Sequence, residues 1–135
     1  MSRHEETFPA RLEAFPRIAA FVEGVCAGAG VPRADCLRLT LVVEELFVNT
    51  VVRGHGGDSD APVHLALDLQ PGRIRVSYAD RGPAFDPFAR PPECGDVDER
   101  PVGGLGLILV RRLSSDFEYS RAEGGNRIDL VIACR

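Results

Sequence analysis

One stretch of the sequence, from Arg33 to about Val52, has the periodicity of a helix that is apolar around almost its whole circumference. On a helical wheel the apolar side chains point in nearly every direction. They are Leu39, Leu41, Val42, Val43, Leu46, Phe47, Val48 and Val51. Such a helix is stable only when other elements cover it, so the rest of the chain must supply a layer that packs against it.

A polar stripe interrupts this helix. Arg38, Glu45, Asn49 and Arg53 fall within about 80° of one another at 100° per residue. Glu45 and Asn49 are i and i+4 neighbours, whereas Glu44 points elsewhere. An ionised carboxylate on a mostly buried helix costs several kcal/mol unless it is paired. Glu45 therefore requires either an arginine partner, Arg38 or Arg53, or a polar cavity.

The remaining segments supply the covering layer. Residues 12–25 have helical spacing after a short extended piece that starts at Thr7, and Pro32 separates this first helix from the second. Two later pairs of segments read as antiparallel hairpins. The first joins 62–69 to 73–79 through Gln70-Pro71-Gly72, and the second joins 117–121 to 127–133 through 123–126. The predicted fold is α+β, a two-layer sandwich with helices on one face of a mixed, mostly antiparallel sheet.

Two segments between the hairpins carry glycines beside polar groups. Asp80 follows a strand and precedes Gly82, where its carboxylate could accept from the amino group of adenine but not from guanine, or could simply form a strand-end turn. The segment 103–107, Gly-Gly-Leu-Gly-Leu, opens a helix that reaches about residue 113. Its free N–H groups could hold phosphate, or its glycines could serve as a hinge. Between these segments, residues 87–102 have no periodicity and read as a mobile lid or a disordered segment.

Composition limits the function classes. The 135 residues, 44% of them hydrophobic, are enough for one domain, which we expect to span 1–135. A net charge of −4 argues against nucleic-acid binding. No signal peptide and no membrane-spanning run is recognised, so a cytoplasmic location without membrane contact is expected. All sixteen basic residues are arginine, which excludes a P-loop or kinase-type lysine on the phosphates.

The cysteines and histidines lack the spacing of metal ligands. Four cysteines lie far apart in the sequence, so free, buried thiols are expected. His4, His55 and His64 fall in predicted loops or a strand, and we expect them to face solvent.

Taken in order, three motifs resemble those of the Bergerat-fold, or GHKL, ATPases. The segment Glu45-Leu-Phe-Val-Asn49 resembles the family's N box. The segment 80–86 resembles its first glycine box, and the segment 103–107 resembles its second. The resemblance covers about residues 8–134, and three ordered motifs are more specific than one. The chain is most similar to the small bacterial anti-sigma-factor serine kinases, which end in a hairpin like Gly124-Gly125-Asn126.

The resemblance implies an ATP site with Mg²⁺. It implies that Glu45 is the general base, that Asn49 is the Mg²⁺ ligand and that Asp80 accepts from adenine. The residues that it assigns to ATP binding are Asn49, Arg53, Asp80, Gly82, Ala84, Phe85, Gly103, Gly104, Leu105, Gly106, Leu107 and Asn126. It further implies a protein serine/threonine kinase and anti-sigma factor that binds a sigma factor, phosphorylates a STAS-type anti-anti-sigma protein, and forms a homodimer.

Three positions depart from the family pattern. Arg53 stands where a histidine often follows the N-box asparagine, Ala84 replaces a glycine, and Asn126 stands where a threonine often helps to fix adenine. If Arg53 pairs tightly with Glu45, the chain could be a nucleotide-dependent binding module without catalysis. A histidine-kinase catalytic domain is a further alternative, which is disfavoured because no dimerising helical hairpin with a phosphoacceptor histidine precedes the domain.

Overall fold

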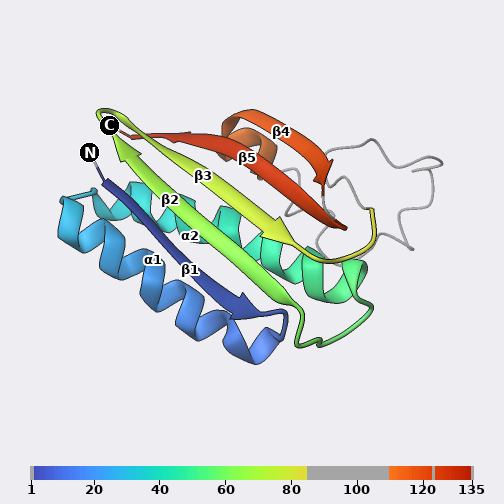
Figure 1. Cartoon of the computed structure of the whole chain (residues 1–135). Helices are drawn as coiled ribbons and strands as arrows, with labels where there is room; N and C mark the ends of the chain where they lie inside the picture. Colours follow the sequence, from blue (N-terminus) through green and yellow to red (C-terminus); the bar gives the residue numbers. More distant parts are fainter. Residues whose placement is uncertain (1, 85–109, 123, 135) are drawn as a thin grey trace, which may run out of the picture.

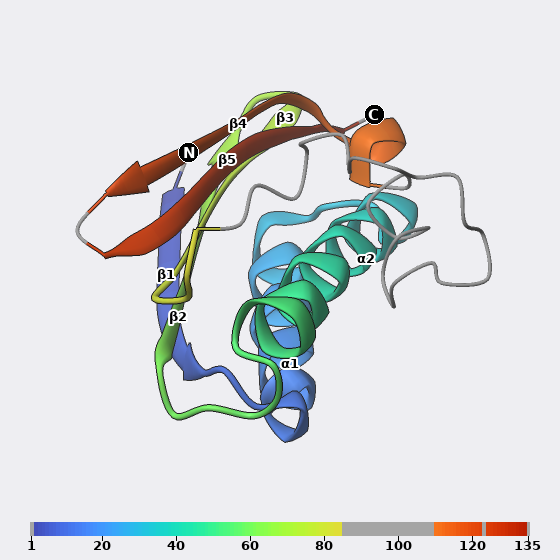
Figure 2. The ribbon, with the colours of Figure 1, turned by 90° about the vertical axis from the view of Figure 1, so that its right-hand side faces the viewer.

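The computed structural model describes residues 2–84, 110–122 and 124–134, and it places a layer of helices against one face of a five-stranded sheet (Figures 1 and 2). The elements, in chain order, are β1 (Ser2–Pro9), η1 (Leu12–Ala14), α1 (Phe15–Ala29), α2 (Arg33–Val48), η2 (Asn49–Gly54), β2 (Pro62–Gln70), β3 (Arg73–Asp80), β4 (Ser115–Ala122) and β5 (Gly125–Ala133). The predicted α+β sandwich is confirmed, and so are the first two predicted helices and both hairpins. Most of the third predicted helix, 103–113, lies outside the described residues.

The sheet has the order β1-β2-β3-β5-β4. We expected a mixed, mostly antiparallel sheet, and all four pairings between the described strands are antiparallel. The last hairpin, β4–β5, joins the first, β2–β3, through β5. This arrangement sets Asn126 opposite Asp80, so the end of the first hairpin meets the start of β5.

The strand β1 was missed by the sequence analysis, which predicted only a short extended piece from Thr7. Residues 2–7 are all polar, and Phe8 is the buried side chain of this strand. The strand pairs with β2 along its whole length, from Ser2 with Leu69 to Pro9 with Pro62. Because β1 lies at the sheet edge, backbone hydrogen bonds rather than apolar alternation hold it, and its charges suit an edge.

The core lies between the helices and the sheet. From α2 it includes Leu39, Val42, Val43, Leu46 and Phe47, and from the facing strands Leu65, Leu67, Ile74, Val76, Leu130 and Ile132. The expectation that α2 is covered almost all round is wrong on one side. Leu41 is 44% exposed and Leu37 50% exposed within the described structure, because only one sheet face and α1 pack against the helix.

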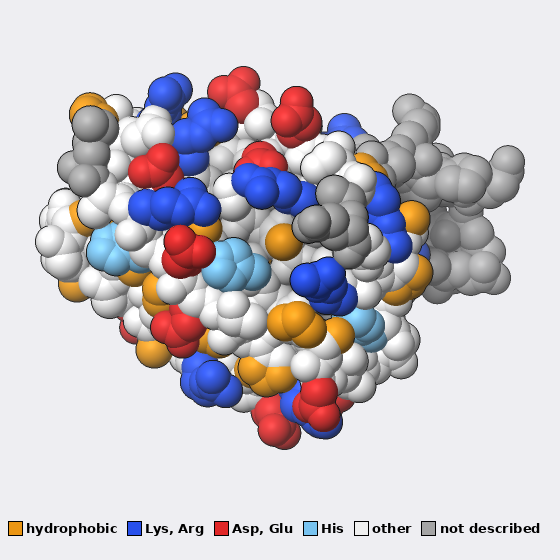
Figure 3. Space-filling view, viewed as in Figure 1, with side chains coloured by type: hydrophobic (Ala, Val, Ile, Leu, Met, Phe, Trp, Pro, Cys, Tyr) orange, Lys and Arg blue, Asp and Glu red, His pale blue; other side chains and the backbone are white. Residues whose placement is uncertain are grey.

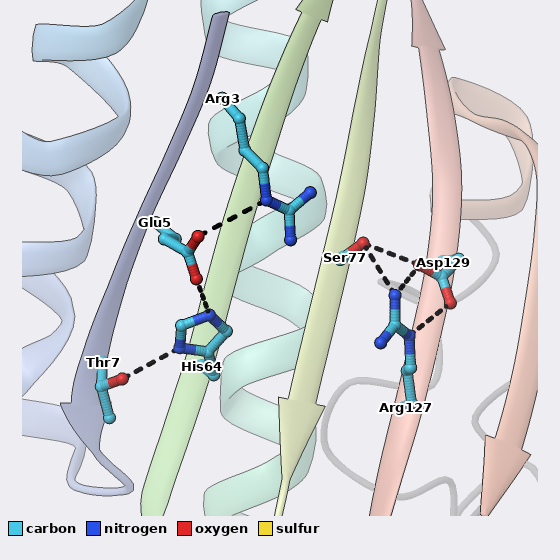
Figure 4. A network of polar contacts seen from close by, with 7 residues as sticks. All are labelled: Arg3, Glu5, Thr7, His64, Ser77, Arg127 and Asp129. Carbon is cyan, nitrogen blue, oxygen red and sulfur yellow. Dashed lines mark hydrogen bonds and ion pairs between the residues drawn. The ribbon is translucent and has the colours of Figure 1, made fainter.

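The other face of the sheet is polar and is not covered by the described helices (Figure 3). On it, His64 Nε2 lies 2.8 Å from Glu5 Oε1, and Thr7 Oγ1 lies 2.9 Å from His64 Nδ1 (Figure 4). A second group joins Arg127 to Asp129 and Ser77. The contacts of His64 with Glu5 and Thr7 and that of Ser77 with Asp129 cross between strands, so they support the sheet register. His64 faces solvent as expected.

Two further expectations can be compared with the described residues. Cys26 is a buried free thiol, while Cys36 and Cys134 are free but only half-buried; Cys94 lies outside the described residues. Within the described part of the chain, no helix is long and apolar enough to cross a membrane.

At the start of β5, the backbone of Gly125 lies close against the backbone of Asp80. A Cβ atom built on Gly125 would lie 2.1 Å from the backbone oxygen of Asp80, far inside any real contact. The obstacle is backbone, not a flexible side chain, so a larger residue requires β3 and β5 to separate. The residue at position 125 must be glycine for Asp80 and Asn126 to lie side by side.

We therefore expect Gly125→Ala to lower the free energy of unfolding by about 1–3 kcal/mol, the range of overpacked sites. Gly24→Ala is the matched control, because a Cβ at this helical position meets nothing within 4 Å. That variant should gain about 0.5–1 kcal/mol, since alanine is the better helix former. Urea unfolding of both variants measures the difference, and a Gly125→Ala protein as stable as wild type would contradict the described pairing.

Candidate functional site

The carboxylate of Asp80, at the end of β3, is held by three hydrogen bonds from three different segments. Its Oδ1 accepts from the Gly82 amide at 2.9 Å and from Asn126 Nδ2 at 2.9 Å. Its Oδ2 accepts from Thr50 Oγ1 at 2.9 Å. A carboxylate offers about four lone-pair positions. Asp80 therefore has a fixed orientation and retains capacity for one more donor.

Thr50 is itself positioned by a buried tyrosine. The Tyr78 hydroxyl lies 2.6 Å from Thr50 Oγ1 and 3.2 Å from the Leu46 carbonyl oxygen. Burial raises the pKa of Tyr78 well above its ordinary value, so the phenol stays protonated and can donate to Thr50. The sequence analysis missed both residues. Their signal was available, because Thr50 follows Asn49 directly and Tyr78 lies two residues before Asp80, on the same strand face.

Asn126 joins Asp80 to the segment that follows it. Besides Asp80, its Nδ2 donates to the Pro83 carbonyl oxygen at 2.9 Å, and its Oδ1 accepts from Tyr119 Oη at 2.5 Å. Arg121 Nη1 donates to the Gly82 carbonyl oxygen at 2.6 Å. The sequence predicted Asn126 as an ATP ligand, and that remains a prediction. In the structure both ends of its amide hold protein groups.

Glu45 on α2 and Asn49 at the start of η2 lie one turn apart, as predicted. Asn49 Nδ2 donates to the Glu45 carbonyl oxygen at 2.8 Å. Asn49 Oδ1 is buried and accepts no hydrogen bond within the described residues. A buried amide oxygen without a donor is a ready ligand for a hard cation, because Mg²⁺ prefers oxygen ligands. The donor at this position therefore fits the metal that the resemblance implies.

Glu45 is half-buried, and burial, followed by the neighbouring charge of Glu44, raises its pKa. Within the described residues Glu45 forms no ion pair with an arginine. Arg38, one of the two partners considered, instead pairs with Asp35 and donates to the Ala133 carbonyl oxygen. Of the two alternatives for this carboxylate, the arginine partner is therefore not found in the described structure.

The second half of the polar stripe lies on a π-helical turn. The sequence predicted one helix to about Val52, but α2 ends at Val48 and η2 continues with π-helical hydrogen bonding. Single π-helical turns are rare in proteins, and those that occur are frequently found at functional sites. This turn carries Asn49, whose amide oxygen is unpartnered, and Thr50, which holds Asp80.

His55 follows the π turn and is half-buried, although we expected it to face solvent. Its Nε2 is buried and has no hydrogen-bond partner within the described residues. Its Cε1 lies 3.8 Å from the position that a Cβ on Gly82 would occupy. The sequence offered no signal for this, because Gly54 and Gly56 beside it suggested an exposed loop.

The structure thus brings Asp80, Gly82 and Asn126 into one cluster, with Asn49 and Glu45 along α2. Arg53 lies with an exposed side chain in η2, and Ala84 is exposed beyond Gly82. The predicted site residues outside the described residues are Phe85, Gly103, Gly104, Leu105, Gly106 and Leu107, together with the lid 87–102.

A surface hollow of about 820 Å³ lies elsewhere, between α1 and the adjoining ends of β1 and β2. It is lined mainly by small and apolar residues, among them Ala20, Phe21, Gly24 and Leu69. It holds no cluster of carboxylates or amides comparable with that at Asp80, so we assign the candidate chemistry to the Asp80 end of the sheet.

The raised pKa of Glu45 predicts a pH-dependent effect of neutralising it. A carboxylate whose pKa is higher in the folded than in the unfolded protein destabilises the fold once pH rises through the folded pKa, and has no such effect below both values. Glu45→Gln should therefore raise the melting temperature of the ligand-free protein at pH 7 by about 1–3 °C. The gain should vanish near pH 3 in thermal unfolding experiments. A gain that persists undiminished at low pH would contradict the electrostatic origin.

Comparison with known proteins identifies the family to which the chain belongs. The family model described as "Histidine kinase-like ATPase domain" matches residues 8–132. The chain is 32% identical over 95 residues to the serine/threonine-protein kinase BtrW of Bordetella bronchiseptica, covering 69% of this chain and 67% of that protein. It is 27% identical over 128 residues to the serine-protein kinase RsbW of Bacillus pumilus, covering 89% and 79%.

Solved structures show the same fold. The crystal structure of the RsbU and RsbW domains of a Mycobacterium tuberculosis protein superposes with a TM-score of 0.71 at 20% identity, covering 99% of this chain. The chain corresponds to only 33% of the length of that structure. A histidine kinase domain from Erythrobacter litoralis superposes with a TM-score of 0.55 at 20% identity, covering 94% of this chain and 62% of that one. The resemblance to the GHKL ATPases is confirmed, and the chain belongs to the family of histidine kinase-like ATPase domains.

Proposed function

We propose that this chain binds ATP with Mg²⁺ at the Asp80 end of the sheet and transfers phosphate to a serine or threonine of a protein partner. The observation that carries the proposal is the fixed carboxylate of Asp80, which keeps one acceptor position after hydrogen bonds from Thr50, Gly82 and Asn126. The family match supports ATP binding, and the names of the kinases among its relatives support phosphate transfer.

Asp80 is suited to distinguish adenine from guanine. Adenine offers an amino donor where guanine offers a carbonyl oxygen, so an acceptor that cannot turn would pair with one and oppose the other. The three donors that hold Asp80 remove the freedom to adapt. Sites built around a fixed hydrogen-bonding group reject the wrong partner strongly, because the buried group is left unpaired.

Asn49 Oδ1 is the group that would hold Mg²⁺, since it is buried and unpartnered. Bound Mg²⁺ would supply neutralisation of the charge on the phosphate oxygens during transfer. The same side chain is fixed from its other end, because Nδ2 donates to the Glu45 carbonyl oxygen. The amide is thus oriented before any ligand arrives.

Glu45 would take the proton of the attacking hydroxyl. A general base works best when its pKa is close to the working pH, and burial moves the pKa of Glu45 in that direction. Because Arg53 stands where the family often has a histidine, a nucleotide-binding module without catalysis was an alternative. That alternative required a tight Arg53–Glu45 pair, and no such pair is found within the described residues.

The partners are proposed from the relatives. Because BtrW and RsbW are named serine or serine/threonine protein kinases, we propose that this chain is an anti-sigma factor whose substrate is a STAS-type anti-anti-sigma protein. On this proposal it holds a sigma factor inactive and releases it when the anti-anti-sigma protein binds, works in the cytoplasm and forms a homodimer. No nucleic-acid or membrane partner is proposed.

Nucleotide selectivity tests the pocket. Calorimetric titration should show Mg²⁺-dependent binding of ATP and binding of GTP at least tenfold weaker, the ratio expected for about 1.4 kcal/mol. Asp80→Asn should weaken ATP binding by about 10–100-fold, because one acceptor becomes a donor. Asp129→Asn, on the open sheet face, is the matched control and should bind as wild type does. Equal affinities of Asp80→Asn and wild type would refute the assignment of Asp80.

Phosphate transfer tests the base. With a STAS-domain substrate and radiolabelled ATP, Glu45→Gln should slow transfer by about 10²–10⁴-fold while ATP still binds. Glu44→Gln, one residue away on α2, should transfer at the wild-type rate. If wild type transfers no phosphate to any serine or threonine of the partner, or if Glu45→Gln transfers as fast as wild type, the kinase proposal fails.

A further inference from the structure

Two side-chain atoms within the described residues are buried without a hydrogen-bond partner, Asn49 Oδ1 and His55 Nε2. A buried polar atom left unpaired costs about 1–3 kcal/mol, so it calls for a reason. The two residues flank the same π-helical turn, η2, which also carries Thr50. A bound Mg²⁺ would be a partner for Asn49 Oδ1, but nothing in the proposed function so far supplies a partner for His55 Nε2.

The imidazole of His55 borders the same point as the polar groups of the site. A Cβ atom on Gly82 would lie 3.8 Å from His55 Cε1, 3.5 Å from Asp80 Oδ1 and 3.8 Å from Asn126 Nδ2. These are ordinary van der Waals distances, so the point above Gly82 has room for one further atom. Cε1 is bonded to both ring nitrogens, so the unpartnered Nε2 lies one bond away from the ring atom that borders this point.

The backbone fixes His55 in this place. Its amide N–H donates to the Thr50 carbonyl oxygen at 2.9 Å, and the Gly57 amide donates to the Val51 carbonyl oxygen at 2.8 Å. Thr50 in turn holds Asp80 through its side chain. The backbone of His55 and the Asp80 carboxylate are therefore both held by Thr50, which keeps the main chain of His55 beside the site.

We propose that His55 is a nucleotide-contacting residue that helps to determine specificity, and that its Nε2 donates a hydrogen bond to a ring nitrogen of the purine beside the amino group that Asp80 accepts. This inference rests on the proposed ATP site. Adenine carries ring-nitrogen acceptors on both sides of its amino group, N1 and N7. A donor next to the Asp80 acceptor complements that edge, and glycine at position 82 leaves space for the ring.

The test compares ATP affinity in four proteins by calorimetry. His55→Ala should bind ATP about tenfold more weakly than wild type, the loss expected for one buried hydrogen bond. His55→Gln should recover much of that loss, because its amide nitrogen can reach the position of Nε2. His64→Ala is the matched control, since His64 lies on the open sheet face, and should bind as wild type does. Thermal unfolding of each ligand-free variant confirms that it is folded.

Analogues that lack one ring nitrogen separate direct contact from a structural effect. Wild type should bind either 1-deaza-ATP or 7-deaza-ATP about tenfold more weakly than ATP. His55→Ala should bind that same analogue as well as it binds ATP, because the lost partner and the lost donor belong to one hydrogen bond. This non-additive result is one that a purely structural role of His55 would not produce.

Three outcomes overturn the inference, and they can be told apart. If wild type binds ATP and His55→Ala binds it equally well, His55 makes no contact, while the proposed function stands. If His55→Ala loses the same factor for ATP and for both analogues, the effect is structural. If wild type does not bind ATP at all, the proposed function fails and the contact fails with it.

Discussion

The pairing of β3 with β5 places Asn126 opposite Asp80, and the rest of the site depends on this contact between strands 46 residues apart. The contact requires glycine at position 125, because the Asp80 carbonyl oxygen lies where a Cβ would be. Once made, it fixes one oxygen of Asp80, while Thr50 on the helical side fixes the other. The carboxylate thus joins the two layers of the fold at the point where a ligand would enter.

The helical layer contributes groups that lower the stability of the ligand-free protein. Glu45 is a carboxylate with a raised pKa, and Asn49 and His55 each bury an unpartnered atom. Such features lower stability, and they persist where function requires them. They lie together on α2, η2 and the residue after η2, whereas the buried residues of α2 are apolar apart from Asp35, which pairs with Arg38. Stability and proposed function are therefore divided between two sides of one helical segment.

Features that follow from spacing within one segment were predicted, whereas several features that do not were missed. The helices, the two hairpins and the approach of Glu45 to Asn49 were predicted, because each follows from spacing within one segment. The edge strand β1 was missed, since its polar residues carry no alternation and its pairing with β2 spans more than fifty residues. The end of α2 at Val48 was also missed, because a shift to π-helical hydrogen bonding leaves no mark on apolar periodicity.

By itself, the sequence determined which residue types stand at which spacing: an acid and an amide one helical turn apart, an acid at a strand end, and two glycine-containing segments in a recognisable order. These features were enough for the fold class and for candidate residues, because they depend on neighbours along the chain. Only the tertiary structure decided that Thr50 and Tyr78 support Asp80, that Asn126 holds protein groups at both ends, and that His55 faces the point above Gly82. Apart from the bond between Asn126 and Tyr119, those contacts join segments separated by about thirty residues or more. Their geometry arises only when the sheet order and the packing of α2 against it are in place.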